Sequence, residues 1–243
     1  MIPLRLDLYG GFGEKGRTCL GVAAGGYRLL LDAGVKTSAR GTRDYHPAIT
    51  RDALAALDAI VITHAHEDHV AALGWCIAHG FHGRVLMSAE TRREADASIA
   101  AYGSADEHAL ARDYATDVLP LGAGALRLGP FDVSTGRSGH MAGAVWIAVD
   151  DGRARLAYCG DMVPSSPVFA TDPLGPADAI VLDASYGDDD TPFGARVAAI
   201  RAWIAAHPQG CVLATPLYGR SAELCAIVEG PLALAPGMRV ALA

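Results

Sequence analysis

The sequence predicts an α/β fold in which two mixed sheets pack face to face and helices flank them. The first observation behind this prediction is that short β-rich runs alternate with alanine-rich helical runs along the chain. The second is the scatter of 28 glycines and 13 prolines, which suits many short connections rather than long helices. The third is a composition of 51% hydrophobic and 19% charged residues over 243 positions, enough to bury a large core. Because strands dominate both halves, a two-layer sheet core covered by helices on its outer faces is the natural packing.

In the first half of the chain, apolar periodicity and turn residues define the strands and the helices between them. The run from Leu4 to Tyr9 alternates apolar and polar residues, as a half-buried strand does. Gly25-Gly26 separates two apolar runs and therefore predicts a hairpin. The segment 90–116 is rich in alanine and in charged residues, and it predicts one or two helices. The expected strands are 4–9, 18–24, 27–32, 59–63 and 84–88, and the other expected helices are 47–57 and 69–79.

The second half of the chain begins as a series of strands and ends in an α/β segment. Asp150-Asp151-Gly152 is a turn signal between two β-rich runs. After residue 190 the pattern changes to helix, strand, helix and strand. We therefore expect one domain over 1–190 and the beginning of a further α/β segment over 191–243. The expected strands are 125–128, 130–135, 144–150, 153–159, 179–183, 211–215 and 238–242, and the expected helices are 194–206 and 220–229.

Charge and composition limit the partners and the compartment. The formal net charge of −7 excludes a general basic coat for nucleic acid, although a local basic groove is compatible with it. The five cysteines form no C-x-x-C pair, which predicts buried free thiols in a reducing compartment. The N-terminus lacks the apolar run of a signal peptide, and the chain has no apolar stretch of about 18 residues. We therefore expect a cytoplasmic protein without a membrane partner, and the sequence is compatible with a homodimer.

The densest group of chemistry-bearing residues is T-H-A-H-E-D-H at 63–69, between a predicted buried strand and a predicted helix. Loops that follow strands are where a rigid scaffold presents ligands. His64 and His66 flank one residue, so in an extended segment their side chains point the same way. Asp68 and His69 fall at the turn into the helix. Since imidazole and carboxylate groups suit zinc and similar metals, these four residues predict a metal site in preference to a histidine-rich surface loop.

Three further residues strengthen the metal prediction. His140 lies in S-G-H-M-A-G, Asp161 follows the β-rich run 153–159, and Asp32 ends the run 27–32. Taken singly, each is typical of a loop, a turn or a strand end. Together with the first motif, and in this order, they predict side chains that converge from separate loops.

These motifs resemble those of the metallo-β-lactamase superfamily, which run Asp, H-x-H-x-D-H, His, Asp and a final His. The resemblance implies an αββα sandwich and two zinc ions per chain, with manganese as the alternative. It also implies that Asp161 bridges the two metals and that Asp32 orients the ligand loop. The implied ligands are His64, His66 and His140 for the first metal, and Asp68 and His69 for the second.

Other motifs indicate a branch of this superfamily. The segment Y-G-G-F-G-E-K-G-R at 9–17 resembles a signature near the start of ribonuclease J proteins. The segment A-I-V-L-D-A-S-Y-G at 179–187 resembles a motif of β-CASP nucleases, with Asp183 in place of their acidic residue. A later G-R-x-x-E-L pattern resembles the opening of the β-CASP domain. The resemblance implies that Asp183 supports the metal site and that Arg220 and Glu223 contact the substrate.

The end of the chain departs from the family pattern. The final metal histidine is not found, because His207, the only histidine after Asp161, lies at a predicted helix end. The later histidine motifs of β-CASP proteins are also missing. We therefore expect that the chain stops early in the β-CASP segment. It would then lack the family's candidate donor of a proton to the leaving group.

The favoured function is hydrolysis of a phosphodiester in RNA by a metal-bound hydroxide. Asp68, His66 and Asp161 would take part directly in catalysis. Two alternatives stay open. The same motifs also serve hydrolases of small thioesters, lactones or phosphoesters, and the acidic net charge favours such substrates. The missing last ligand instead favours a non-catalytic module that keeps its metals for structure.

Overall fold

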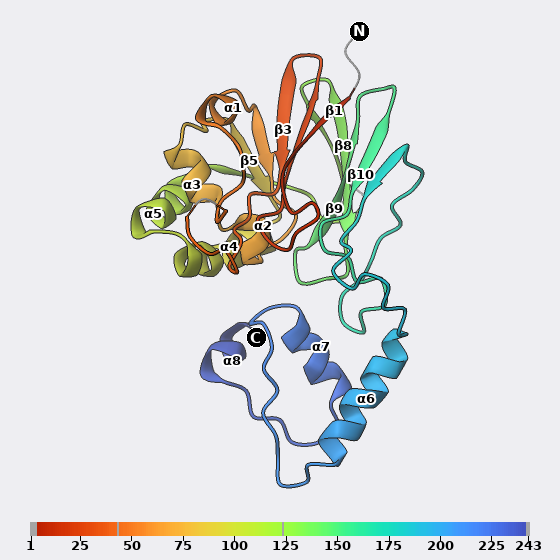
Figure 1. Ribbon diagram of the computed structural model, residues 1–243. Coiled ribbons are helices and arrows are strands. Elements are labelled where there is room, and N and C mark those ends of the chain that lie inside the picture. The colour runs from red at the N-terminus through yellow and green to blue at the C-terminus, as the bar shows by residue number, and fades with distance from the viewer. Residues whose placement is uncertain (1–3, 43, 123, 242–243) are drawn as a thin grey trace.

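The computed structural model describes residues 4–42, 44–122 and 124–241. Two sheets stack against each other, helices lie outside the first sheet, and the last part of the chain lies below both sheets (Figure 1). This arrangement confirms the predicted α/β fold with two mixed sheets flanked by helices.

The first sheet is mixed and carries the parallel strands that lead to the site. Its first three strands pair antiparallel and the others pair parallel. Three of the four parallel strands, all except the edge strand 116–118, are short, nearly continuous apolar runs, as expected for strands that are covered on both faces. Their carboxyl ends therefore meet at one edge of the sheet. The strand order is β1 (Arg5–Gly10), β2 (Cys19–Ala24), β3 (Tyr27–Leu31), β4 (Ala59–Val61), β5 (Arg84–Met87) and β6 (Thr116–Val118).

The second sheet is antiparallel except at one edge, where β10 and β11 pair parallel. Its order is β11 (Ala179–Val181), β10 (Arg155–Tyr158), β9 (Val145–Asp150), β8 (Phe131–Arg137) and β7 (Gly124–Leu128). Apolar side chains from the facing sides of both sheets form one buried core between them. Its members include Leu20, Leu29, Leu31, Phe131, Val133, Ile147 and Tyr158.

Helices cover the outer face of the first sheet and enclose a second apolar core. They are α1 (Arg51–Ala55), α2 (Glu67–Val70), α3 (Leu73–Ala78), α4 (Ala89–Tyr102) and α5 (Ala105–Asp113). Capping side chains determine where several of these helices begin. Thr50 and Ser88 accept from backbone N–H groups at the starts of α1 and α4. Ser104 and Glu107 form a reciprocal capping box at α5.

The structure corrects several predicted boundaries in this half. The expected helix 47–57 is reduced to α1, because Thr50 caps it and only the residues after this cap are helical. The expected helix 69–79 is two short helices, α2 and α3. The expected helical segment 90–116 contains two helices, α4 and α5, and only its last residue belongs to strand β6.

The tail contains α6 (Phe193–Ala205), α7 (Arg220–Ile227) and α8 (Pro236–Ala241). The predicted strand 211–215 is wrong: no strand of the described residues lies beside it, and Val212 is 92% exposed. The predicted strand 238–242 is also wrong, because α8 occupies that segment and begins at Pro236, a residue favoured at the first position of a helix. Residue 242 lies outside the described residues. None of the helices in the described segments has the length and apolarity needed to cross a bilayer.

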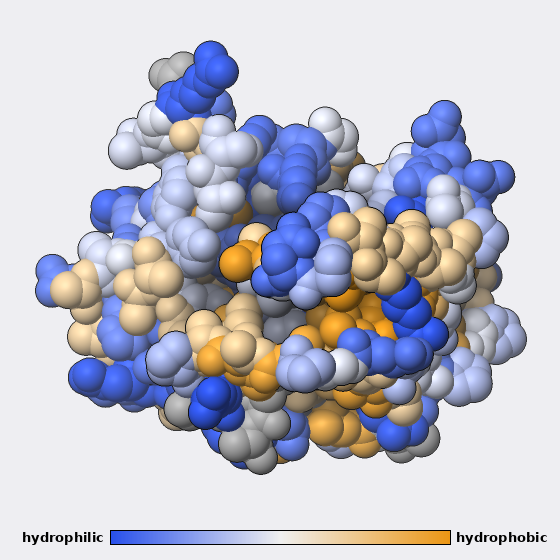
Figure 2. Space-filling view, turned by 90° about the horizontal axis from the view of Figure 1, so that it is seen from below, coloured by the Kyte–Doolittle hydropathy of each residue, from blue (hydrophilic) through white to orange (hydrophobic). Residues whose placement is uncertain are grey.

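One short stretch of the tail packs firmly on the sandwich. Tyr218 contacts the apolar core between the first sheet and its helices. Ser221 and Glu223 are 2% exposed. The rest of the tail carries exposed apolar residues, and Figure 2, which views the molecule from this side, shows hydrophobic residues gathered among hydrophilic ones. The contact of Tyr218 therefore fixes the start of α7 against the edge of the first sheet.

Glu94, on α4 near Tyr218, should make stability depend on pH. Its Oε2 atom is buried without a hydrogen-bond partner, and burial raises the pKa of this carboxyl from 4.5 to about 7. The unfolded chain loses this proton near pH 4.5, so stability should fall as pH rises from there to about 7. One pKa unit corresponds to about 1.4 kcal/mol, and partial solvent screening reduces the total to about 2 kcal/mol.

Glu94→Gln should remove this pH dependence. Urea unfolding at pH 5 and pH 8 would then show the variant more stable than the parent at pH 8 by about 2 kcal/mol, and similar to it at pH 5. The exposed Asp190 offers a matched control, since Asp190→Asn should leave the pH profile of the parent unchanged. Equal pH profiles for Glu94→Gln and the parent would contradict this assignment.

Candidate metal centre

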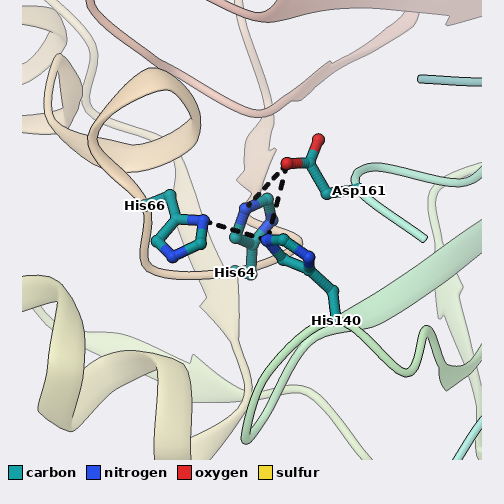
Figure 3. Close-up of side chains that lie close together, drawn as sticks. All are labelled: His64, His66, His140 and Asp161. Carbon is teal, nitrogen blue, oxygen red and sulfur yellow. Dashed lines mark hydrogen bonds and ion pairs between the residues drawn. The ribbon is translucent and has the colours of Figure 1, made fainter. Parts of the chain in front are cut away.

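Side chains from separate loops converge at the carboxyl edge of the parallel strands (Figure 3). His64 and His66 follow β4, His140 lies between β8 and β9, and Asp161 follows β10. Each of the four offers a ligand atom, and these atoms lie within 4.8 Å of one another. The sequence motifs that were expected to converge therefore do so.

Backbone hydrogen bonds hold the ligand loop, residues 64–69, against the segment that follows β3. Two N–H groups after β3 donate to carbonyls of the loop, from Ala33 to His69 (2.7 Å) and from Val35 to Glu67 (3.0 Å). A Cβ atom on Gly34 would lie 1.7 Å from the carbonyl oxygen of Asp68. Only glycine therefore allows the two segments to approach so closely.

Asp32 supports the metal centre through several buried hydrogen bonds. Its side chain is fully buried, and its backbone adopts φ +62°, a left-handed conformation that Asp tolerates better than most residues. Its carboxylate accepts from the backbone N–H of Thr63 (2.7 Å) and from the hydroxyl of Tyr158 (2.7 Å). It also contacts His69 Nδ1 at 2.8 Å. These contacts fit the expected role of orienting the ligand loop.

The hydroxyl of Thr63 determines the tautomer of His64. It donates its single proton to Asp32, with its oxygen 2.9 Å from Oδ2. Its oxygen therefore accepts from His64 Nδ1, 3.0 Å away. With Nδ1 protonated, the lone pair of the neutral ring is on Nε2, which faces the cluster and has no hydrogen-bond partner. His66 faces the cluster with its other nitrogen, Nδ1, which lies 3.0 Å from His140 Nε2 (Figure 3), while its Nε2 is buried without a partner.

Asp161 lies between two groups of possible ligands. Its Oδ2 atom is 3.8 Å from His64 Nε2 and 3.5 Å from His140 Nε2. Its Oδ1 atom is 3.1 Å from His69 Nε2. Asp68 Oδ1 lies 4.0 Å from the same nitrogen. One carboxylate thus faces a three-histidine group on one side and an Asp–His pair on the other.

Burial keeps the three-histidine group neutral. It lowers the pKa of His64 and His66, and it lowers that of His140 to about 4. Neutral imidazole is the form that binds metal ions. The buried, unpartnered Nε2 of His64 beside a carboxylate fits a cation, because a buried polar atom without a partner otherwise costs about 1–3 kcal/mol.

The other side of the centre concentrates negative charge. Burial alone would lower the pKa of His69, but the adjacent Asp161 and Asp32 outweigh it and raise that pKa well above its usual value. Burial likewise opposes ionisation of Asp161, and the neighbouring imidazoles, His69 above all, lower its pKa far below the usual range. A second cation placed here would interact with the same carboxylates that favour the charge on His69.

The centre opens into a cavity of about 1230 Å³ between the sandwich and the start of α7. Asp68 and Asp161 have side chains about one quarter exposed at its floor. Arg220 lines its wall close to His140 and contributes to lowering the pKa of that imidazole. A Cβ atom on Gly219 would lie 3.0 Å from the carbonyl oxygen of His140, so the start of α7 passes directly beside the loop between β8 and β9 that carries His140.

The remaining sequence-predicted residues lie at different depths. Asp183 lines the cavity, and its carboxylate bonds Ser185 rather than the cluster. Arg220 lines the cavity, whereas Glu223 is 2% exposed beneath it and pairs with its guanidinium. His207 Nδ1 contacts the carbonyl of Trp203 at the end of α6, in agreement with the helix-terminal interpretation.

Sequence reasoning missed two partners of Asp32. Thr63 directly precedes His64, so its position was a usable signal. Tyr158 gave no such signal, because its contact joins residues 126 positions apart.

Residues 27–223 match the family model described as beta-lactamase superfamily domain, which covers most of the chain. The chain belongs to the β-lactamase superfamily. This agrees with the resemblance seen in the motifs, and it makes the His/Asp cluster of this superfamily protein a metal-binding site of a hydrolase fold.

This superfamily protein is also similar to larger curated relatives. It is 26% identical to the transcription termination factor FttA of Methanothermobacter thermautotrophicus, over 93% of this chain and 39% of that one. It is 30% identical to the ribonuclease TTHA0252 of Thermus thermophilus, over 68% of this chain and 40% of that one. The chain thus spans about two fifths of the length of these relatives. The matches confirm distant homology to β-CASP ribonucleases over much of the chain.

Solved structures with the metallo-β-lactamase fold are also similar to it. The fold protein YhfI of Bacillus subtilis is 18% identical, with a TM-score of 0.45 over 65% of this chain and 62% of that one.

Proposed function

We propose that this protein hydrolyses phosphodiester bonds of RNA at a two-metal centre. The observation that carries the proposal is the cluster of three imidazoles around Asp161 beside a wide cavity, in which His64 Nε2 is buried without a hydrogen-bond partner. A volume of about 1230 Å³ exceeds that of most small-molecule pockets, about 300–1,000 Å³. The ribonuclease among the similar proteins supports the same substrate class.

In this proposal the two groups around Asp161 hold two cations. His64, His66 and His140 would hold the first, Asp68 and His69 the second, and Asp161 both. When bound, such ions supply Lewis acidity, which activates water near neutral pH and neutralises charge on a phosphate. Zinc suits this ligand set, and manganese accepts the same ligand types.

The protein's own groups position the reactants. Asp32 fixes the ring of His69, and Thr63 fixes the tautomer of His64. The carboxylate of Asp68 faces the cavity, where it would accept a proton from an attacking water. Arg220, held by Glu223, would bind a non-bridging phosphate oxygen. We infer that Glu223 acts through Arg220, because its own side chain is buried.

Metal removal tests the proposal. Full-length protein supplied with zinc or manganese should cleave a labelled single-stranded RNA and bis-p-nitrophenyl phosphate. Chelation should abolish both activities, and added metal should restore them. Asp161→Ala should be inactive with metal present. RNA left intact by the metal-loaded protein would contradict the proposal.

The acidic net charge of −7 favours a second candidate, a hydrolase of small thioesters, lactones or phosphoesters. Five acidic residues and two cations line the cavity, which agrees with this candidate. The acidic residues are Glu14, Glu67, Asp68, Asp161 and Asp183, and the cations are Lys15 and Arg220. Turnover of a thioester or lactone without cleavage of RNA would select this alternative.

A further inference from the structure

The loop between β1 and β2 forms one wall of the cavity, and the proposed chemistry assigns no role to it. Residues 11–16 line the cavity together with the metal ligands. Two side chains of this loop are exposed there. Phe12 is 36% exposed, and Lys15 is exposed as well. An exposed aromatic ring and an exposed cation thus lie three residues apart on one wall of the cavity.

Other charges of the loop are already neutralised, and Lys15 is not. Glu14 pairs with Arg17 (2.6 Å) and with Lys36 (2.7 Å). Hydrogen bonds from Arg17, against the opposing effect of burial, hold the pKa of Glu14 at about 2. Within the described residues, Lys15 makes neither an ion pair nor a side-chain hydrogen bond. Its ammonium group is therefore available to an anion in the cavity.

The backbone of this loop is fixed to the metal centre. The N–H of Thr18 donates to the carbonyl of Asp68 (2.9 Å), and the N–H of Arg17 donates to that of Val35 (2.9 Å). A Cβ atom on Gly16 would lie 3.0 Å from Cα of Lys36, which shows how closely the two segments pack. These contacts hold the end of the loop, next to Lys15, beside the metal ligands, which reduces the ordering cost of binding there.

The ring of Phe12 differs from another aromatic ring that lines the cavity. The guanidinium of Arg196 lies 5.0 Å from the ring centroid of Tyr186, so one face of that ring is already covered. No such contact covers Phe12 among the described residues. A solvent-exposed phenyl face beside an unpaired cation is the combination by which proteins bind single-stranded nucleic acids. Bases stack on the aromatic ring, and the cation binds a phosphate.

We propose that Phe12 and Lys15 bind one nucleotide of single-stranded RNA next to the cleaved phosphate, with the ring stacked on the base and the ammonium group on a phosphate. This inference rests on the proposed function and specifies its substrate as an unpaired strand. A base within a duplex is stacked on both faces, so its face is closed to Phe12. Stacking on any base is chemically similar, so binding should be largely independent of sequence.

Binding, measured without turnover, tests this inference. Fluorescence anisotropy of a labelled single-stranded RNA would be recorded with the full chain under chelation, so that the RNA stays intact. Phe12→Ala should weaken binding about tenfold or more, since stacking contributes about 1–3 kcal/mol per base. Phe12→Trp should retain the parental affinity, because it keeps an aromatic face.

Salt dependence tests the cation separately. Lys15→Ala should reduce the slope of log affinity against log salt by about 0.7, the value for one phosphate contact on a single strand. Arg51→Ala is the matched control, because Arg51 is exposed on α1 and does not line the cavity. It should leave affinity and slope unchanged. Unchanged circular dichroism melting of each variant would show that folding is intact.

The outcomes separate this inference from the proposed function. Failure of the parent protein to bind or cleave RNA would overturn the RNA function itself. Parental binding that Phe12→Ala and Lys15→Ala leave unchanged would overturn only the roles of these two residues. Equal affinity for a duplex of the same sequence would also overturn the single-strand specificity.

Discussion

Replacing His66 by alanine should halve the metal content of the purified protein and reduce phosphodiester hydrolysis by about three orders of magnitude or more. His66 Nδ1 lies in the cluster, 3.0 Å from His140 Nε2, so the substitution removes one of the three imidazoles proposed to hold the first cation. A metal centre supplies several kcal/mol of transition-state stabilisation, and about 4 kcal/mol corresponds to a thousandfold in rate. Inductively coupled plasma mass spectrometry gives the metal content, and initial rates on bis-p-nitrophenyl phosphate give the activity.

His82→Ala is the matched control for this variant. The ring of His82 is exposed, contacts the carbonyl of Gly80, and precedes the amino end of β5, at the edge of the sheet opposite to the ligands. It should keep both metal equivalents and the parental rate. Two undiminished equivalents in His66→Ala would refute the ligand assignment.

Asp32→Ala should cause the largest loss of stability among single substitutions at the centre. Its carboxylate is the partner of His69, of the hydroxyls of Thr63 and Tyr158, and of one backbone N–H, and all are buried. Removing one member of a buried charged network costs about 3–5 kcal/mol. For a chain of this size that corresponds to a decrease in Tm of about 10 °C, measurable by circular dichroism.

The conservative variant separates the effect on the backbone from the effect on the metal. Asp32→Asn retains tolerance of the left-handed backbone, so it should lose less stability than Asp32→Ala. It still weakens the contact that orients His69, so metal affinity should fall about 10–100-fold. Asp58, whose carboxylate accepts from one backbone N–H at the surface, provides the control. A loss for Asp58→Ala equal to that for Asp32→Ala would contradict the proposed role of the buried network.

The residues of the cluster were predictable because one dense motif and three weaker ones occur in a recognisable order along the chain. The segment 63–69 contains four possible metal ligands within seven consecutive residues. Asp32 and Asp161 come at the ends of recognisable apolar runs, and His140 lies between glycines. Parallel pairing of β3 and β4 then brings their carboxyl ends together without further information.

The support around the ligands was not predictable in the same way. Tyr158 reaches Asp32 only because the two sheets pack face to face, and no local pattern records that contact. The role of Gly34 was equally unpredictable, because it follows from the close approach of Asp68, which is distant in sequence. Such contacts depend on the relation between elements rather than on any one of them.

The errors in the tail have a common physical cause. The segment 211–215 has the composition of a strand, but within the described residues it has no neighbouring strand to pair with. Strand propensity reflects packing against neighbours, so an apolar run without them stays irregular. At the end of the chain, Pro236 favours a helix start, and this local preference outweighed the apolar run that follows it.

The most direct test of the two-metal centre is anomalous diffraction at the zinc absorption edge from crystals grown with zinc. The account predicts two peaks on either side of Asp161. The first should lie about 2.0–2.1 Å from nitrogens of His64, His66 and His140, and the second beside His69 and Asp68. Absence of zinc from this cluster at saturating concentration, or peaks that leave these three imidazoles unligated, would contradict the account.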